Sequence, residues 1–285
     1  MPVSKVVNSE QWSVISDCLL FTVYCLLITG CAVTRPTLKI GLVAPFEGRY
    51  REVGYEVIYA LRLAVREANA AGGVAGYSVE LVSLDDSGDP QMAVEQARKL
   101  AADPQVLGVI GHWLDETTIA AASEYDEAGL PLLAVTTAPE LPPLTFRLAP
   151  TTLSCRPSTL SPCPQTVEDL RLLGGSAENV IVSAPAPLPD DSADPAFAER
   201  YRAISNGVVP RFKAVLAYDA ARLLLDAIAR DVQANKTATR NGVAEALTRS
   251  NFAGLSGPIR FNTERDWAEP ATWAYQWKNG EWVKP

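Results

Sequence analysis

The sequence predicts an α/β protein built around a parallel sheet whose two faces are covered by helices. Two observations lead to this fold class. Short apolar segments alternate along the chain with longer segments in which apolar residues recur at helical spacing. The short segments are also mostly apolar, and strands of this kind are buried on both faces in parallel sheets. We therefore expect a three-layer αβα lobe.

The elements of this lobe follow one another in a regular order. Helices are expected over 53–73, 89–104 and 116–129, and four strands over 38–45, 77–84, 106–112 and 131–137. Gly72 and Gly73 predict the end of the first helix. Asp89 is a candidate N-terminal cap of the second helix, and Pro90 would then occupy its first position, where the missing N–H has no effect. Ligands in such sheets bind beyond the carboxyl ends of the strands.

Composition excludes some classes of partner. The chain has 285 residues, of which 48% are hydrophobic and 20% charged, as in globular proteins with a sizeable core. Its net charge is −8, which argues against nucleic acid or an anionic membrane surface as the main partner.

The N-terminal region predicts export. Residues 18–30 are uncharged, but they are fewer than the about 20 apolar residues of a membrane-spanning helix, and they fit a signal peptide over 1–30. The segment ends in Ile-Thr-Gly-Cys, which resembles the bacterial lipobox. We expect lipid at Cys31, a tether over 31–37 and an extracytoplasmic protein anchored to the bacterial cell membrane. An ordinary signal with a coincidental cysteine is the alternative, and the region before it fits poorly, since Lys5 is its only basic residue.

The remaining cysteines and the single histidine suggest no metal site. Cys155 and Cys163 lie in a segment rich in proline and serine, and they are either a disulfide or two unpaired thiols. His112 is far from both, so zinc is not expected. It also has no nucleophile motif around it. The spacing of acids over 85–89 is not that of a calcium loop, so helix capping and a solvated loop are expected there.

The order of the segments is similar to that of a known family. The stretches "LKIGLVAPFEG", "AVREANAAGGVAG", "GVIGHWLDETTIAAAS" and "TTAPEL" resemble the first lobe of type I periplasmic binding proteins, in particular the branched-chain amino-acid (leucine-binding-like) group of ABC-transporter substrate-binding proteins. Near the C-terminus, "AYDAARLLLDAIA" resembles the family's long helix and "ATWAYQWKNGEWV" a hairpin turned at Asn279-Gly280.

The resemblance implies two lobes of unequal size. Family members fold as two αβα lobes that close on a ligand between them. Here the strand–helix repeats expected after "FRLAPT" are replaced by the segment that contains the two cysteines. The expected organisation is a first lobe over 38–145 and 188–262, and a strongly reduced second lobe over 146–187 and 263–285 that includes the C-terminal β-hairpin.

The resemblance also implies a ligand site on the first lobe. Thr137 matches a position that offers a hydroxyl to the ligand's carboxylate, and Val135 matches one that offers a backbone group. Asp115 stands where the family usually has serine, and a loop acid or helix cap is the alternative role for it. The other candidate ligand-binding residues are Glu116 and Thr117, which follow it, and the aromatic Trp113 and Tyr50.

The expected function is binding without chemistry. The leading hypothesis is a lipid-anchored solute-binding protein of an ABC transporter, for amino acids or related small polar solutes, with permease subunits as partners. A sensory or scaffold module, or a shortened relative that has lost solute binding, is the alternative. An enzyme is not expected, and neither is a cofactor, because the sequence has no recognisable nucleophile, metal cluster or phosphate-binding loop.

Overall fold

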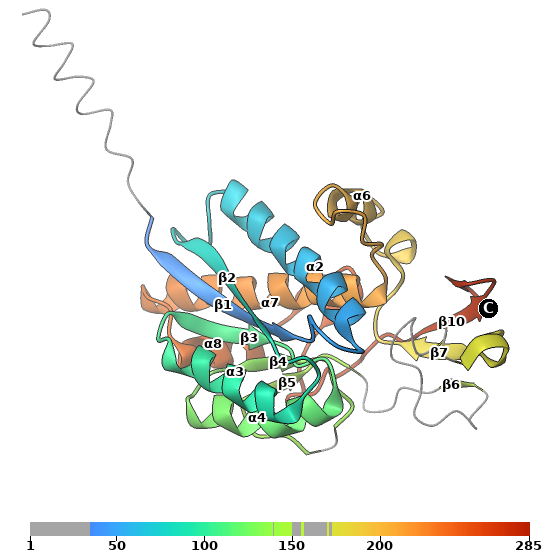
Figure 1. The fold of residues 1–285 in the computed structure, drawn as a ribbon. Helices are drawn as coiled ribbons and strands as arrows, with labels where there is room; N and C mark the ends of the chain where they lie inside the picture. The colour runs from blue at the N-terminus through green and yellow to red at the C-terminus, as the bar shows by residue number, and fades with distance from the viewer. Residues whose placement is uncertain (1–34, 139, 150–154, 157–169, 171–172) are drawn as a thin grey trace, which may run out of the picture. The chain divides into compact units, whose positions relative to one another are not determined.

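Five parallel strands form the main sheet in the order β2-β1-β3-β4-β5 (Figure 1). The computed structural model describes residues 35–138, 140–149, 155–156, 170 and 173–285. The strands of the main sheet are β1 (Thr37–Ala44), β2 (Ser78–Asp85), β3 (Val106–Ile110), β4 (Leu132–Ala134) and β5 (Thr145–Arg147). The predicted parallel sheet is confirmed, and β5 is a strand that the sequence did not predict. From β1 the chain first adds β2 on one side and then β3, β4 and β5 on the other, so the strand order reverses between β1 and β3. Ligands bind at this point in sheets of this topology.

Helices cover both faces of the main sheet. The helices of one face are α2 (Arg51–Ala70), α7 (Phe212–Asn235) and α8 (Arg240–Thr248), and those of the other face are α3 (Pro90–Ala102) and α4 (Asp115–Glu127). The predicted cap of α3 is confirmed, because the Asp89 side chain accepts hydrogen bonds from the backbone N–H groups of Gln91 and Met92 at 2.9 Å. The three-layer αβα prediction is also confirmed.

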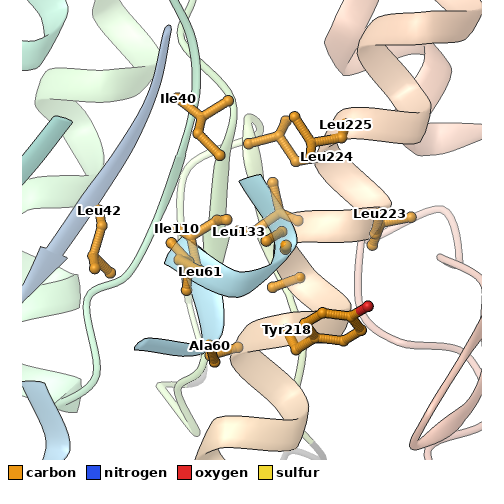
Figure 2. Close-up of a cluster of buried hydrophobic side chains, with 14 of the residues drawn as sticks. Ile40, Leu42, Ala60, Leu61, Ile110, Leu133, Tyr218, Leu223, Leu224 and Leu225 are labelled. Carbon is orange, nitrogen blue, oxygen red and sulfur yellow. The ribbon is translucent and has the colours of Figure 1, made fainter. Parts of the chain in front are cut away.

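The larger core lies between the main sheet and α2, α7 and α8. Figure 2 shows Ile40 of β1 and Ile110 of β3 near Leu224 of α7, with Leu61 of α2 beside them. The helix α7 can approach β3 closely because Gly108 has no side chain: a Cβ atom there would lie 2.6 Å from Cδ1 of Leu224. The second core cluster lies against α3 and α4.

The second sheet of the described chain is antiparallel and small. Its order is β11-β10-β7-β6, and its strands are β6 (Cys155–Arg156), β7 (Ile181–Ala184), β10 (Trp273–Lys278) and β11 (Glu281–Val283). The predicted C-terminal hairpin is confirmed, with positive φ angles of 52° and 83° at Asn279 and Gly280 in its turn. Tyr275 of β10 is buried, and it accepts a hydrogen bond at Oη from the Leu188 backbone N–H at 2.7 Å.

Smaller elements complete the described chain. They are the helix α6 (Phe197–Arg202), the 3₁₀ turns η1 (Gly174–Ala177) and η2 (Pro189–Asp191), and a ribbon of β8 (Phe252–Gly254) with β9 (Gly257–Ile259). In the part of the chain that the structure describes, no helix is long and apolar enough to cross a membrane.

The segment that replaces the expected strand–helix repeats forms a strand at one place that the sequence did not predict. Cys155 and Arg156 form β6, which pairs with Val182 and Ile181 of β7. Backbone pairing to a strand that lies later in the chain gives no periodic signal in so short a segment. The expected signal peptide, the lipid site at Cys31 and the possible partner Cys163 lie outside the described residues.

Candidate functional site

The candidate site lies in the loops at the carboxyl ends of the main strands, and Asp85 holds two of these loops together. Asp85 is the last residue of β2. Its carboxylate accepts hydrogen bonds from the Phe46 backbone N–H at 2.7 Å and from the backbone and hydroxyl of Ser87, both at 2.8 Å. Burial raises the pKa of Asp85, but these hydrogen bonds outweigh burial and hold the pKa below its ordinary value. The loop after β1 is therefore fixed against the loop after β2.

A buried polar chain supports the loop after β3. Nδ1 of His112 lies 2.6 Å from Oδ2 of Asp86, and its Nε2 lies 3.2 Å from Oη of Tyr125 on α4. All three side chains are fully buried. Burial, with a further contribution from the charge of Asp86, raises the pKa of Tyr125. The expectation of a solvated loop is therefore wrong for Asp86, whose carboxylate is used inside the protein to fix the histidine.

The centre of the candidate site is Asp115, the first residue of α4. Its Oδ1 accepts hydrogen bonds from the Thr136 hydroxyl at 2.6 Å and from the Thr137 backbone N–H at 2.9 Å. Its Oδ2 accepts one from the Thr137 hydroxyl at 2.6 Å. The loop after β4 thus directs three donors at one carboxylate on the loop after β3.

The surroundings of Asp115 favour its charged form. Partial burial raises the pKa of Asp115, but the bonds from Thr136 and Thr137 and the charge of Arg147 outweigh burial, so the pKa lies below its ordinary value. Arg147 is the last residue of β5, is 5% exposed, and pairs through Nη1 with Asp266 at 3.1 Å. The first turn of a helix is also a favourable place for a negative charge.

The structure brings together some of the residues proposed from the sequence. Thr137 and Asp115 are in direct contact, and Val135, which directly follows β4, is half-buried. Glu116 is exposed in the first turn of α4. The sequence did not indicate Thr136. Successive residues of a strand point to opposite sides, so a continuing strand would turn Thr136 away from the side that Thr137 faces. The strand ends at Ala134, so both threonines can reach one carboxylate.

Other proposed residues serve the local structure. Thr117 is fully buried, and its hydroxyl donates to the Leu114 carbonyl at 3.1 Å. Trp113 is only 3% exposed and belongs to the larger core cluster, so its ring does not form an exposed stacking surface. Its Nε1 has no hydrogen-bond partner among the described residues. Tyr50 is half-buried, with the Arg49 guanidinium 5.4 Å from its ring centre.

A metal site requires several ligating side chains in one place. Within the described ranges, no three His, Cys, Asp or Glu side chains are grouped so that they could hold a metal ion. The arrangement at Asp115 is instead a set of neutral N–H and O–H donors around an anion.

The family profile for periplasmic binding proteins matches residues 37–169 and 159–281 of this sequence. The chain belongs to this family. The resemblance seen in the sequence motifs is therefore confirmed. The curated relatives of this periplasmic binding protein include an amino acid binding protein of Pseudomonas aeruginosa, which is 34% identical over 108 residues. The Leu/Ile/Val-binding protein of Escherichia coli (strain K12) is 33% identical over 105 residues.

These sequence matches are partial. The match to the P. aeruginosa protein covers 38% of this chain and 28% of that protein, and the match to the E. coli protein covers 36% and 28%. The chain therefore spans less than a third of the length of either relative.

Solved structures show the same fold over a longer range. A leucine binding protein of Thermotoga maritima aligns with a TM-score of 0.70 at 18% identity, covering 86% of this chain and 97% of that one. A branched-chain amino acid transporter substrate binding protein of Streptococcus pneumoniae, in complex with isoleucine, aligns with a TM-score of 0.68 at 19% identity, covering 87% and 100%. At these identities the likeness concerns the fold alone.

Proposed function

We propose that this periplasmic binding protein captures an amino acid or a related small polar solute outside the cytoplasm, and that it passes the solute to the permease subunits of an ABC transporter. Lipid at Cys31 would hold it to the bacterial cell membrane. It is proposed to bind its ligand without transforming it. Family membership and the names of the relatives, an amino acid binding protein and a Leu/Ile/Val-binding protein, support this proposal.

One structural observation carries the proposal furthest. The hydroxyl groups of Thr136 and Thr137 and the Thr137 backbone N–H converge on one point beyond the carboxyl end of β4. The edge of the sheet where they lie is where ligands bind in open α/β sheets. Three convergent neutral donors are suited to a small polar group, and buried or partly buried polar contacts fix the neighbouring loops after β1, β2 and β3.

A ligand screen tests this function. We would purify the full chain carrying Cys31→Ser in detergent and measure its melting temperature with amino acids, their amides and small peptides. Any ligand that raises the melting temperature would then be titrated calorimetrically. A dissociation constant in the micromolar range or below would support solute capture, because a ligand at 100 times its dissociation constant stabilises the folded state by about 2.7 kcal/mol. No binding by any compound of the screen would contradict it.

A second candidate function is favoured by a specific observation. The three donors already bind Asp115, so free leucine, isoleucine and valine are expected to bind in the millimolar range or not at all. A sensory or scaffold module, or a shortened relative that has lost solute binding, agrees with such a site. Uptake measurements separate the candidates: cells that lack this chain should take up a radiolabelled ligand from the screen more slowly if it delivers solute, and at an unchanged rate if it does not.

A further inference from the structure

The contacts of Asp115 are those that an incoming carboxylate would need. Each of its two oxygens is held by a hydroxyl, and Oδ1 is held by a backbone N–H in addition, at 2.6, 2.6 and 2.9 Å. These three donors are neutral groups, and Arg147 acts on Asp115 through its charge. A carboxylate accepts about four hydrogen bonds, so about one acceptor position of Asp115 remains. These donors reach both oxygens of one carboxylate, and in this structure that carboxylate is Asp115.

The position of Asp115 favours continued occupation of the Thr136 and Thr137 donors by its carboxylate. The aspartate is the first residue of α4, so its backbone is fixed by the helix, and its side chain needs no ordering to reach the donors. An intramolecular group competes at a high effective concentration, which reaches the millimolar range even for flexible tethers. A free carboxylate solute must displace this tethered group and would then lie beside its negative charge.

We infer that Asp115 is a tethered carboxylate that occupies the donors of Thr136 and Thr137 and thereby sets the ligand specificity of the site. The inference rests on the proposed function for its biological meaning and deepens it. It assigns a ligand class: solutes whose end at this point is an amide or an amine, which can donate to the remaining acceptor position of Asp115. Solutes that present a carboxylate there are excluded.

A purely structural role for Asp115 makes a different prediction. If the carboxylate serves only to join the loop after β4 to the start of α4, its removal lowers stability, the donors of Thr136 and Thr137 no longer converge, and they do not bind a free carboxylate. The Thr137 backbone N–H distinguishes the two cases, because its amide resonance reports directly on what it donates to. We would record amide spectra of the ¹⁵N-labelled full chain in detergent for wild type, Asp115→Ser and the matched control Glu199→Ser. Glu199 is also an exposed acid in the first turn of a helix, α6.

The spectra are recorded with and without 50 mM acetate at constant ionic strength. We expect the Thr137 resonance to move in Asp115→Ser and to return towards its wild-type position when acetate is added. Wild type and Glu199→Ser should not respond. If acetate leaves Thr137 of Asp115→Ser unchanged, or shifts the wild-type resonance equally, the inference is overturned. Asp115→Asn, which keeps the size of the side chain and one acceptor, serves in the same way if the serine variant does not give a folded spectrum.

Titration with L-leucine and L-leucinamide tests the ligand class. Asp115→Ser should bind leucine at least tenfold more tightly than wild type does, and the preference for leucinamide over leucine should fall by a similar factor. Equal leucine affinity in wild type and variant would overturn the inference. A response to acetate without binding of any amino acid, amide or amine supports the tethered carboxylate and contradicts the proposed function, so the two can fail separately.

Discussion

Arg240 provides the sharpest test of how the first lobe is held together. It is the first residue of α8, and its guanidinium donates four hydrogen bonds to backbone carbonyls of other elements. The donor–acceptor distances are 3.0 Å to Val106, 3.1 Å to Ala128, 3.0 Å to Ala101 and 2.7 Å to Asp103. One side chain therefore binds the C-terminal ends of α3 and α4 and the first residue of β3.

The magnitude expected for Arg240→Ala follows from these contacts. Hydrogen bonds from a charged donor contribute about 1.5–3 kcal/mol each, and the negative ends of two helices add a favourable interaction with the positive charge. The four contributions do not add fully, because the site is only partly buried and water can reach some of the carbonyls. We expect a loss of about 3–5 kcal/mol in the free energy of unfolding. For a unit of this size that lowers the melting temperature by about 6–20 °C.

Urea unfolding followed by circular dichroism at 222 nm measures this loss. The matched control is Arg249→Ala in the C-terminal cap of the same helix. Arg249 pairs with Glu245 at 3.4 Å, and both side chains are about 70% exposed, at 72% and 69%. An exposed pair of this kind contributes about 0.3–0.5 kcal/mol. The control removes the same side chain from the same helix without removing a contact between elements.

Arg240→Lys separates geometry from charge. Lysine keeps the positive charge, but a single ammonium group cannot present the planar set of donors that reaches four carbonyls. We expect most of the loss to remain. If Arg240→Ala were within 1 kcal/mol of Arg249→Ala, the reasoning that this guanidinium joins the helix ends would be refuted. If Arg240→Lys were as stable as wild type, charge alone would explain the contact.

Three further predictions concern other parts of the chain. Cys31→Ala should abolish partition into detergent when the protein is expressed in a bacterial host, and an equally membrane-bound variant would contradict the lipid site. Gly54→Ala should lower the free energy of unfolding by about 1–3 kcal/mol, because its Cβ would lie 2.2 Å from the Pro45 carbonyl oxygen; Gly175→Ala, with nothing within 4 Å, is the control. Asp219→Ala should cost about 3–5 kcal/mol in urea unfolding, because it leaves two backbone N–H groups and a serine hydroxyl at the β8–β9 turn without their acceptor, and a loss under 1 kcal/mol would contradict this.

The periodicity of the sequence was enough to predict most of the first lobe. Strands β1 to β4, helix α2 and the Asp89 cap of α3 all have signals within a few residues of chain. The strand β5 has three residues, too few for a pattern, and its place in the sheet depends on pairing with β4. Contacts such as those of Arg240, which reach more than 100 residues back along the chain, leave no local signal at all.

The sequence predicted some of the residues of the candidate site, but it did not predict how these residues contact one another. Thr137 and Asp115 were proposed from neighbouring loops, and these loops do meet. No local pattern indicated that Asp115 would be the acceptor for Thr137, because the direction of a side chain at the start of a helix depends on the loop before it. Trp113 was proposed as a ligand-binding residue, but its side chain lies in the core shortly after β3.

The core that lies under α7 and α8 has a consequence for how this protein is synthesised. Its members come from both ends of the described chain, such as Leu38 and Leu61 on one side and Leu224 and Leu247 on the other. Until α8 has left the ribosome, the apolar surfaces of β3 and α2 that pack against α7 and α8 remain uncovered. Nascent chains of most lengths therefore expose an aggregation-prone surface, and contacts of such long sequence separation form slowly. We expect the protein to depend on a holding chaperone until translation ends, and to fold only afterwards.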